Sequence, residues 1–496
     1  MSTDCNVFDG CAAAPRFVTV PVRWYVLSEP LFSTLLTVTD VMAGFAPAQV
    51  AAVALAALSA SMTTAIDTVR IIPPIYPGAR CIQPGTANAD RVNKQPMPRF
   101  SIVLLAAALT AATPASAATT QSGDALRAAL QRNVNQFLAA RAKPEHISAV
   151  TLSVSLKGAP RTIDVVTGTT KYAGAGSRIS PGTLWQIGSN TKAFTAVLIL
   201  QLEAEGKLNI DQTVGRWLPQ YPAWKDVTIR RLLNMTSGIP GYDFADTMLS
   251  AYARDPMRDF TRRQLVAYVY PGTPGAPKPT TGYAYSNTNY ILAEMIVERA
   301  SGDGYTAELE RRIFAPLGLH DTYYAAYSYP ASVRDRMASG YFYSHDPDNA
   351  PLAPLLGRDM RDASVSWMQG AGGIVSTPQD LIRWVRALYA GSILQAKQRA
   401  ELMSLVSLKN GQPISKTTLA DPKGFGLGVA EMTTPETGTI WFYEGATLGY
   451  RMVHAYFPRQ DAVIAFGLNS QPDSKQNQSG KLVIAIYKTL HAAGKL

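Results

Sequence analysis

Apolar positions recur with two different periods along this chain, and they separate strand-rich ends from a helical middle. Residues 123–143 carry an apolar side chain every three or four positions, which predicts an amphipathic helix. Residues 149–156 alternate apolar and small polar side chains as a half-buried strand does, and residues 161–168 supply its hairpin partner. Four more strand patterns and a final helix lie toward the C-terminus, at 424–432, 439–445, 450–458, 462–469 and 476–491.

The middle of the chain is helical in pattern. Residues 191–206 are apolar on nearly every side, so this helix is expected to be buried. Further helical patterns lie at 288–300, 305–315 and 378–390, between long loops rich in Gly and Pro. We therefore expect an α+β protein with one antiparallel sheet, built from both ends of the chain and flanked by the terminal helices, and with an inserted all-helical domain. The boundary between the two regions is the expected cleft.

Residues 97–117 have the three parts of a secretory signal peptide. A Met and a basic residue, Arg99, precede an apolar stretch, and the small triplet Ala115-Ser116-Ala117 closes the segment. The apolar stretch is too short to span a bilayer, so we expect a periplasmic or extracellular protein with no stable membrane span after cleavage. Residues 1–96 show no sustained period and are interpreted as a non-native or poorly structured leader, which leaves 118–496 as the folded domain. All three cysteines (Cys5, Cys11 and Cys81) lie before that domain.

Composition narrows the function classes. The chain is 47% hydrophobic and 17% charged with a net charge of +10, but it contains no run of five like charges and no basic stripe interleaved with aromatics. We therefore expect no nucleic-acid partner. The five histidines have no metal-ligand spacing, and His320 and His454 are interpreted as structural. No G-x-S-x-G elbow, Walker A motif or dinucleotide fingerprint is present, so neither a metal nor another cofactor is expected.

The clearest chemical signal is a Ser-x-x-Lys motif at the start of the apolar helix, formed by Ser189 and Lys192. Residues three apart share a helix face, so the lysine amine lies beside the serine hydroxyl. Apolar surroundings lower a lysine pKa, and a neutral amine can take the serine proton. The alternative is an N-capping serine with a lysine that reaches solvent.

A second motif, Tyr285-Ser286-Asn287, stands between a Pro/Gly-rich loop and an apolar helix. In extended backbone Tyr285 and Asn287 point to the same side, where the Tyr hydroxyl can relay a proton and the Asn amide can bind substrate. The alternative is a buried Tyr in a loop followed by an Asn turn.

Together these motifs resemble class C β-lactamases, D-alanyl-D-alanine carboxypeptidases and related esterases, the family of serine β-lactamases and penicillin-binding proteins. Four other stretches resemble the same family: LLNMTSGIPGY (232–242), IFAPLGLHDTYY (313–324), AGGIVSTPQDLIRW (371–384) and GATLGY (445–450). The resemblance implies a β-lactamase/transpeptidase-like fold and an acyl-enzyme on Ser189. It also implies that Lys192 and Tyr285 form the acid–base pair, that Asn287 positions substrate, and that the N–H groups of Ser189 and Ala446 form the oxyanion hole.

One stretch departs from the family pattern. The family usually places Lys or His, a small residue and Gly on the strand that edges the site, where the cation binds a substrate carboxylate. Here the resemblance puts Tyr443 in place of the cation and Glu444 beside it, while Gly445 still permits close backbone approach. We therefore expect Tyr443, Glu444, Gly445 and Ala446 to line the substrate site, and carboxylate substrates to bind poorly unless Arg451 reaches in.

Three functions remain open at this point. The first is an amide hydrolase on D-amino-acid peptides, cell-wall fragments or β-lactams, with carboxypeptidase activity included. The second is a carboxylesterase on the same scaffold. The third is a penicillin-recognising sensor without turnover, which the complete set of Ser189, Lys192 and Tyr285 disfavours because acyl transfer uses all three.

Overall fold

The computed structural model describes residues 115–496. The predicted leader (1–96) and residues 97–114 of the predicted signal peptide lie outside the described residues. The first described element, α3 (Ala115–Glu145), takes in the last three residues of that signal peptide and the predicted first helix. A search of the described helices for one long and apolar enough to cross a membrane finds none.

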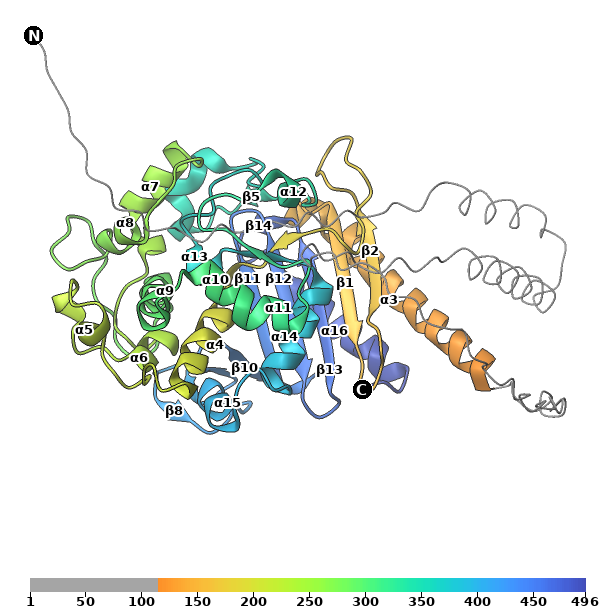
Figure 1. The fold of residues 1–496 in the computed structure, drawn as a ribbon. Coiled ribbons are helices and arrows are strands. Elements are labelled where there is room, and N and C mark those ends of the chain that lie inside the picture. Colours follow the sequence, from red (N-terminus) through yellow and green to blue (C-terminus); the bar gives the residue numbers. More distant parts are fainter. Residues whose placement is uncertain (1–114) are drawn as a thin grey trace, which may run out of the picture. The chain divides into compact units, whose positions relative to one another are not determined.

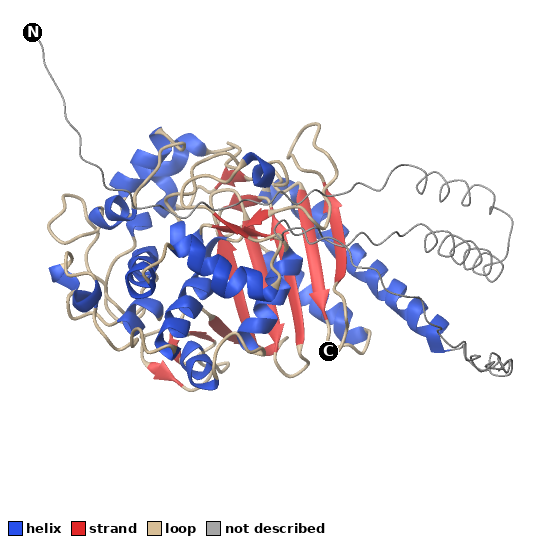
Figure 2. Ribbon diagram, in the orientation of Figure 1, coloured by secondary structure: helices blue, strands red, loops and turns tan. Residues whose placement is uncertain are grey.

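The described chain is organised around a nine-stranded antiparallel sheet in the order β2-β1-β13-β12-β11-β10-β9-β7-β8 (Figure 2). Both ends of the chain build it, because β1 forms a hairpin with β2 and also pairs with β13, with Val150 opposite Leu468. The strands are β1 (Ala149–Ser155), β2 (Ile163–Gly168), β7 (Leu405–Ser407), β8 (Pro413–Ile414), β9 (Lys423–Phe425), β10 (Ala430–Thr434), β11 (Gly438–Ala446), β12 (Arg451–Phe457) and β13 (Ala462–Leu468).

Each face of this sheet carries its own helices (Figure 1). The terminal helices α3 and α16 (Ser479–Ala492) cover one face, where Leu130, Val134, Ile486 and Leu490 are fully buried. The alternation predicted for β1 explains this packing, since Val150, Leu152 and Val154 belong to the same cluster. On the other face α4 (Thr191–Ala204) and α14 (Pro378–Tyr389) belong to the main core, which continues into the inserted region.

The insertion between β2 and β7 contains the remaining helices of the described chain. They are α5 (Val214–Trp217), α6 (Ile229–Leu233), α7 (Asp246–Arg254), α8 (Arg262–Ala267), α9 (Asn287–Ser301), α10 (Tyr305–Leu309), α11 (Ala315–Leu317), α12 (Ala331–Arg334), α13 (Gln369–Gly372) and α15 (Ala396–Leu402). Short helical turns join them: η1 (Gly188–Asn190), η2 (Pro222–Trp224), η3 (Tyr242–Phe244), η4 (Glu310–Phe314) and η5 (Pro347–Leu355).

The predicted architecture is confirmed, but the insertion is not all-helical. It holds a three-stranded sheet of β3 (Trp185–Gln186), β6 (Ile374–Ser376) and β4 (Tyr323–Tyr324). It also holds β5 (Tyr341–Tyr343), which pairs in parallel with β14 (Ser470–Pro472). Strands of two or three residues are too short to show an alternating pattern, which is why the sequence did not reveal them.

The strand predicted at 424–432 is likewise interrupted. It forms two antiparallel strands, β9 and β10, joined by a turn in which Gly428 has a φ of 78°. A Cβ at Gly428 would lie 2.8 Å from the carbonyl oxygen of Lys192 and from the hydroxyl of Tyr290. The glycine therefore permits both the turn and its close packing on the helix that carries the site.

Candidate active site

Ser189 lies on the short turn η1, between β3 and the buried helix α4. Two glycines let this turn approach strand β11. Gly188 has a φ of 50°, and a Cβ there would lie 2.7 Å from the backbone nitrogen of Ala446. A Cβ at Gly445 would collide with the carbonyl of Ile187 and lie 2.7 Å from Asn190 Nδ2. Close backbone approach is therefore what both glycines supply, and it brings Ser189 beside Ala446.

The buried side chain of Asn190 anchors this turn to the central sheet. Asn190 Nδ2 donates to the carbonyl oxygens of Ile187 and Met452, at 2.9 Å each. Its Oδ1 lies 2.8 Å from Nδ1 of the buried His454 on β12. The turn that carries Ser189 is thus tied to the central sheet by Asn190, a residue that the sequence pattern did not single out.

Lys192 is fully buried on the first turn of α4, as the Ser-x-x-Lys pattern predicted. Its Nζ lies 3.0 Å from Ser189 Oγ and donates to the carbonyl oxygen of Ala371 at 2.8 Å. Burial lowers the Lys192 pKa from its usual value to about 7, and the nearby carboxylate of Asp243 partly opposes this effect. At neutral pH a large fraction of the amine is therefore uncharged and can accept the serine proton.

Tyr285 reaches the same oxygen from the other region. Its hydroxyl donates to Ser189 Oγ at 2.6 Å, and its ring lies 4.8 Å from Lys192 Nζ. Burial raises the pKa of Tyr285 well above its ordinary value, while hydrogen bonds with Ser189 and Tyr443 oppose that shift. Tyr285 is therefore a neutral phenol that can pass a proton on, and Lys192 is the group suited to be the base.

A small cavity of about 20 Å³ opens directly at Ser189. That volume holds roughly one water-sized group. Its lining residues are Ser189, Asn287, Trp367, Met368, Ala371, Gly372 and Ala446, so none of the described residues that line it is a cation. Ser189, Ala446 and Asn287 meet here as the sequence predicted, although they come from η1, β11 and α9.

Asp243 is the ionisable site residue that sequence reasoning missed. Asn287 Nδ2 donates to its Oδ2 at 2.7 Å. Within the described residues, Asp243 Oδ1 and Asn287 Oδ1 are buried acceptors without a hydrogen-bond partner. Burial raises the pKa of Asp243, while a hydrogen bond from its own backbone, the charge of Lys192 and hydrogen bonds from Asn287 oppose that shift. The only sequence signal was position, since Asp243 directly follows the family-like stretch 232–242.

The strand β11 divides the predicted third motif between two faces of the sheet. Tyr443 faces the site, where its ring lies 6.2 Å from that of Phe425. Glu444 faces the opposite side, because successive strand residues alternate. Its two oxygens accept from Asn477 Nδ2 at 2.8 Å and Ser479 Oγ at 2.6 Å. The Glu444 carboxylate is therefore bonded on the side of α16, although Glu444 is among the residues that line a cavity of about 310 Å³ beside Tyr285 and Tyr443.

Arg451 does not replace the missing cation either. It is fully buried and pairs with Glu145 at 2.7 Å, on the face of the sheet covered by α3 and α16. It also donates to Ser470 O at 2.8 Å and to Asn477 Oδ1 at 2.7 Å. Its Nε and Nη1 are bonded within the fold on the face of the sheet away from Ser189, so Arg451 does not join Tyr443 at the site.

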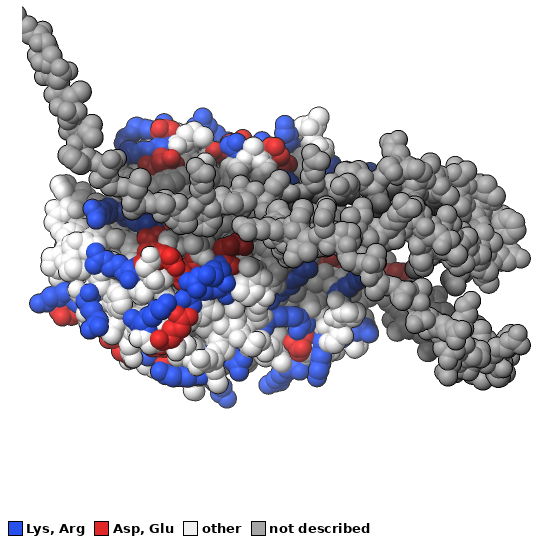
Figure 3. All heavy atoms as spheres, in the orientation of Figure 1, with Lys and Arg blue, Asp and Glu red and all other residues white. Residues whose placement is uncertain are grey.

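Charge and metal patterns add little to the site. On the face that Figure 3 shows, Lys and Arg side chains are intermingled with Asp and Glu. Among residues 115–496, no group of three or more His, Cys, Asp or Glu is arranged to hold a metal ion.

Comparison with known proteins places this geometry in a family. The Beta-lactamase family model matches residues 138–488, and the chain belongs to the β-lactamase family. Penicillin-binding protein 4* of Bacillus subtilis (strain 168) is 30% identical over 307 residues, which are 61% of this chain and 64% of that protein. Penicillin-binding protein 4 of Amycolatopsis lactamdurans is 30% identical over 222 residues, 43% of this chain and 53% of that one. The matches thus span less than two thirds of these relatives.

Solved structures share the fold over nearly their whole length. The D-amino acid amidase of Ochrobactrum anthropi SV3, complexed with D-phenylalanine, matches with a TM-score of 0.61 at 24% identity. The match covers 74% of this chain and 99% of the amidase chain. A D-stereospecific amidohydrolase from Streptomyces sp. has a TM-score of 0.58 at 23% identity and covers 74% and 98%. The predicted family and fold are confirmed, and the relatives support the predicted class of a β-lactamase-related serine hydrolase.

Proposed function

We propose that this protein hydrolyses amide bonds through an acyl-enzyme on Ser189, and that its substrates carry a protonated amine near the scissile carbonyl. D-amino-acid amides and short D-peptides are the substrate class. Neutral Lys192 takes the Ser189 proton as Oγ attacks the carbonyl carbon, and Tyr285 passes a proton to the departing amine. Water then attacks the ester, and the same two groups return the serine to its resting state. The N–H groups of Ser189 and Ala446 are the proposed oxyanion hole.

The preference for an amine rests on one observation. Asp243 Oδ1 and Asn287 Oδ1 are buried acceptors that lack a partner among the described residues, and Asn287 lines the cavity at Ser189. Buried acceptors left unpaired are costly, so a ligand that donates hydrogen bonds is favoured there. An ammonium group supplies both the donors and the opposite charge.

The same surroundings disfavour a substrate carboxylate. Tyr443 stands where the family has a cation, and Arg451 is bonded to Glu145 on the other side of the sheet. D-alanyl-D-alanine carboxypeptidase and β-lactamase activities are therefore secondary candidates. The names of two structural neighbours, a D-amino acid amidase and a D-stereospecific amidohydrolase, agree with the amide-hydrolase proposal. A carboxylesterase on this scaffold is the alternative, and a non-catalytic sensor is the alternative of another class.

The test compares the protein with its Ser189→Ala variant on matched substrates. D-phenylalanine p-nitroanilide and its L enantiomer differ only in stereochemistry, and the N-acetyl derivative removes the amine charge while adding an acetyl group. We expect the free D-amine to be hydrolysed fastest and the variant to be inactive. Equal rates with and without the N-acetyl group would refute the amine preference, and hydrolysis of p-nitrophenyl esters alone would favour the esterase.

Intact masses after exposure to a fluorophosphonate and, separately, to benzylpenicillin test the nucleophile. Label from the fluorophosphonate on Ser189 is the expected result, and added benzylpenicillin label would show that the site accepts a carboxylate after all. Absence of both labels would refute the serine-hydrolase proposal and favour the sensor.

A further inference from the structure

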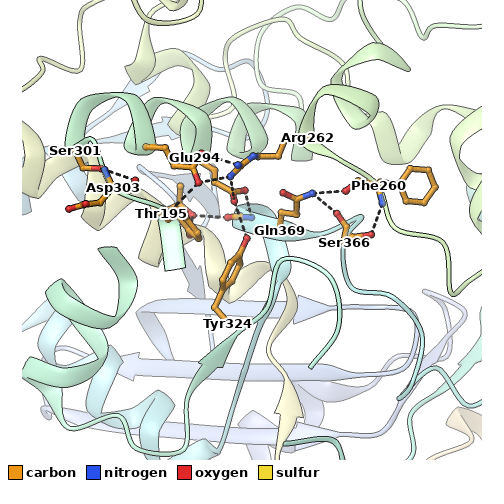
Figure 4. A network of polar contacts seen from close by, with 12 residues as sticks. Thr195, Phe260, Arg262, Glu294, Ser301, Asp303, Tyr324, Ser366 and Gln369 are labelled. Atoms are coloured by element: carbon orange, nitrogen blue, oxygen red, sulfur yellow. Dashed lines mark hydrogen bonds and ion pairs between the residues drawn. The ribbon is translucent and has the colours of Figure 1, made fainter. Parts of the chain in front are cut away.

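Glu294 is a fully buried carboxylate on α9, outside the catalytic set (Figure 4). Its Oε1 accepts from Arg262 Nη1 at 2.7 Å and from the Tyr324 hydroxyl at 3.0 Å. Its Oε2 accepts from the backbone N–H of Gly370 at 2.8 Å. A buried carboxylate is costly unless it is paired. Here Oε1 pairs with a partly exposed arginine, and Oε2 pairs with a backbone amide.

Gly370 belongs to α13, the segment that meets the catalytic lysine. The next residue, Ala371, supplies the carbonyl that accepts from Lys192 Nζ at 2.8 Å. The carbonyl of Gly370 in turn accepts from Thr195 Oγ1 at 2.6 Å. Glu294 and Thr195 therefore hold the N–H and the C=O of Gly370, directly before the carbonyl that Lys192 uses.

The start of this segment is itself strained. Gln369 has a φ of 37°, a backbone conformation that residues other than glycine rarely adopt. Its amide Nε2 donates to Phe260 O at 3.0 Å and to Ser366 O at 2.8 Å, and these two bonds hold the side chain in place (Figure 4). Backbone in such a conformation persists only where its surroundings hold it, and such sites are common near catalytic groups.

We propose that Glu294 is a positioning residue for Lys192, acting through the backbone of Gly370 and Ala371. The proposal rests on the function proposed above, in which Lys192 is the base. When the Ala371 carbonyl accepts one N–H of the neutral amine, the lone pair of that amine is free to point at Ser189 Oγ. A turn that moves by a fraction of an ångström misdirects this lone pair without touching the substrate.

The charged and titratable groups around both residues bear on the test. Asp243 of η3, Tyr285, and Tyr290 of α9 lie around Lys192. Glu294 is surrounded by Arg262 of α8, Glu298 of α9, Tyr305 of α10 and Tyr324 of β4. The alternative is a purely structural role, in which Glu294 only joins α8 to α9 through Arg262. The two roles use different oxygens, so variants can separate them.

Four single variants of the full chain make the experiment: Glu294→Ala, Glu294→Gln, Thr195→Val and Tyr324→Phe. Glutamine keeps an oxygen that can accept from Gly370, while alanine leaves that N–H unpaired. Thr195→Val removes the other anchor of Gly370 and leaves the ion pair intact. Tyr324→Phe removes a bond to Oε1 alone and is the matched control.

Under the proposal, Glu294→Ala and Thr195→Val lower kcat by about tenfold to a hundredfold with KM changed less than about twofold. Glu294→Gln keeps most of the wild-type kcat, and kcat of Tyr324→Phe stays near the wild-type value. The acidic limb of the kcat profile also moves to lower pH in Glu294→Ala. The Ala371 carbonyl stabilises the protonated form of Lys192, so a displaced carbonyl lowers the Lys192 pKa. Unfolding midpoints of all four are measured alongside.

Loss of thermal stability in Glu294→Ala and Thr195→Val without any change in kcat or in the pH limb would overturn the proposal. So would equal loss of kcat in Glu294→Gln and Glu294→Ala. Fluorophosphonate labelling of Ser189 in the wild-type chain is the separate check. If the wild type is not labelled, the proposed function has failed. If it is labelled, but no variant shifts the acidic limb of its kcat profile, only the role of Glu294 has failed.

Discussion

His454 Nδ1 lies 2.8 Å from Oδ1 of Asn190, so a buried imidazole of the central sheet is bonded to the residue that directly follows Ser189. Burial lowers the pKa of His454 to about 3. The ring is therefore neutral at physiological pH, and its Nδ1–H donates to the asparagine. The interpretation of His454 as a structural histidine fits this arrangement, and it gives the residue an indirect effect on the site.

The first prediction concerns stability against pH. His454 has a depressed pKa in the folded state, so the unfolded chain binds more protons between its ordinary pKa of about 6.5 and about 3. Its contribution to stability is therefore complete above pH 6.5 and falls by roughly 1.4 kcal/mol per pH unit as the pH drops through that window. In His454→Gln the amide can still donate to Asn190, but this slope disappears.

Urea unfolding of both proteins at several pH values between 4 and 7 measures this difference. We expect His454→Gln to be less stable at pH 7 and to lose less stability on acidification. Parallel curves for the two proteins would show that His454 takes up no proton on unfolding in this range.

A second prediction concerns the base. Because the pKa of Lys192 is about 7 and the neutral amine is the proposed reactive form, kcat/KM for the N-acetyl anilide, which has no amine to titrate, rises with pH through a midpoint near 7. For the free-amine anilide the same rise is followed by a fall as the substrate's own amine, with a pKa of about 7.7–8.0, loses its proton. Lys192→Met keeps an unbranched side chain in a fully buried position and loses the base, so kcat falls by about 10² to 10⁴ while the fold is kept. Circular dichroism and steady-state rates check the two halves. A variant that keeps near-wild-type kcat would exclude Lys192 as the base.

The sequence predicted the sheet, the terminal helices and the Ser189–Lys192–Tyr285 constellation because each depends on local pattern or a motif. It did not predict Asn190, Asp243 or Glu294 as supports, since their partners His454, Asn287 and Gly370 are distant in the chain. The bonding of the Glu444 carboxylate could not be read from the motif, because it depends on the alternation of β11. Its neighbours Tyr443 and Gly445 face the site, so Glu444 must face α16.

A third prediction tests the amine site. Asp243→Asn removes the charge but keeps a side chain that can bond to Asn287. We expect kcat/KM for D-phenylalanine p-nitroanilide to fall roughly tenfold to a hundredfold, the magnitude of a lost charge-assisted hydrogen bond. The N-acetyl derivative serves as the control and should change much less.

The same variant also shifts the pH profile. Asp243 raises the Lys192 pKa, so its removal moves the acidic limb to a lower pH. Equal losses on both substrates with an unmoved limb would mean that Asp243 neither binds the amine nor acts on Lys192.

A fourth prediction separates the two faces of β11. Glu444 accepts from Ser479 at the first residue of α16, where a carboxylate is also favoured by the helix dipole. Glu444→Thr should lower the free energy of unfolding by about 1–3 kcal/mol and leave kcat/KM unchanged. Tyr443→His on the facing side should instead improve carboxylate-bearing substrates relative to the free-amine anilide. Denaturant unfolding and paired kinetics distinguish the two, and an altered substrate preference in Glu444→Thr would contradict the assignment of faces.

The last prediction concerns export, which we propose from residues 97–117 of the sequence. Cleavage after Ala117 leaves a chain that starts at Ala118, and among residues 123–145 of α3, whose burial the structure describes, the first buried side chain is Leu126. Signal peptidases need small residues at the last and third-last positions of the signal, here Ala117 and Ala115. Expression of the chain from Met97 in a bacterial host should therefore yield periplasmic or secreted protein whose intact mass begins at Ala118. Ala117→Leu should give the uncut form with an unchanged fold, whereas cytoplasmic protein that retains residues 97–117 would show that the segment is not a signal peptide.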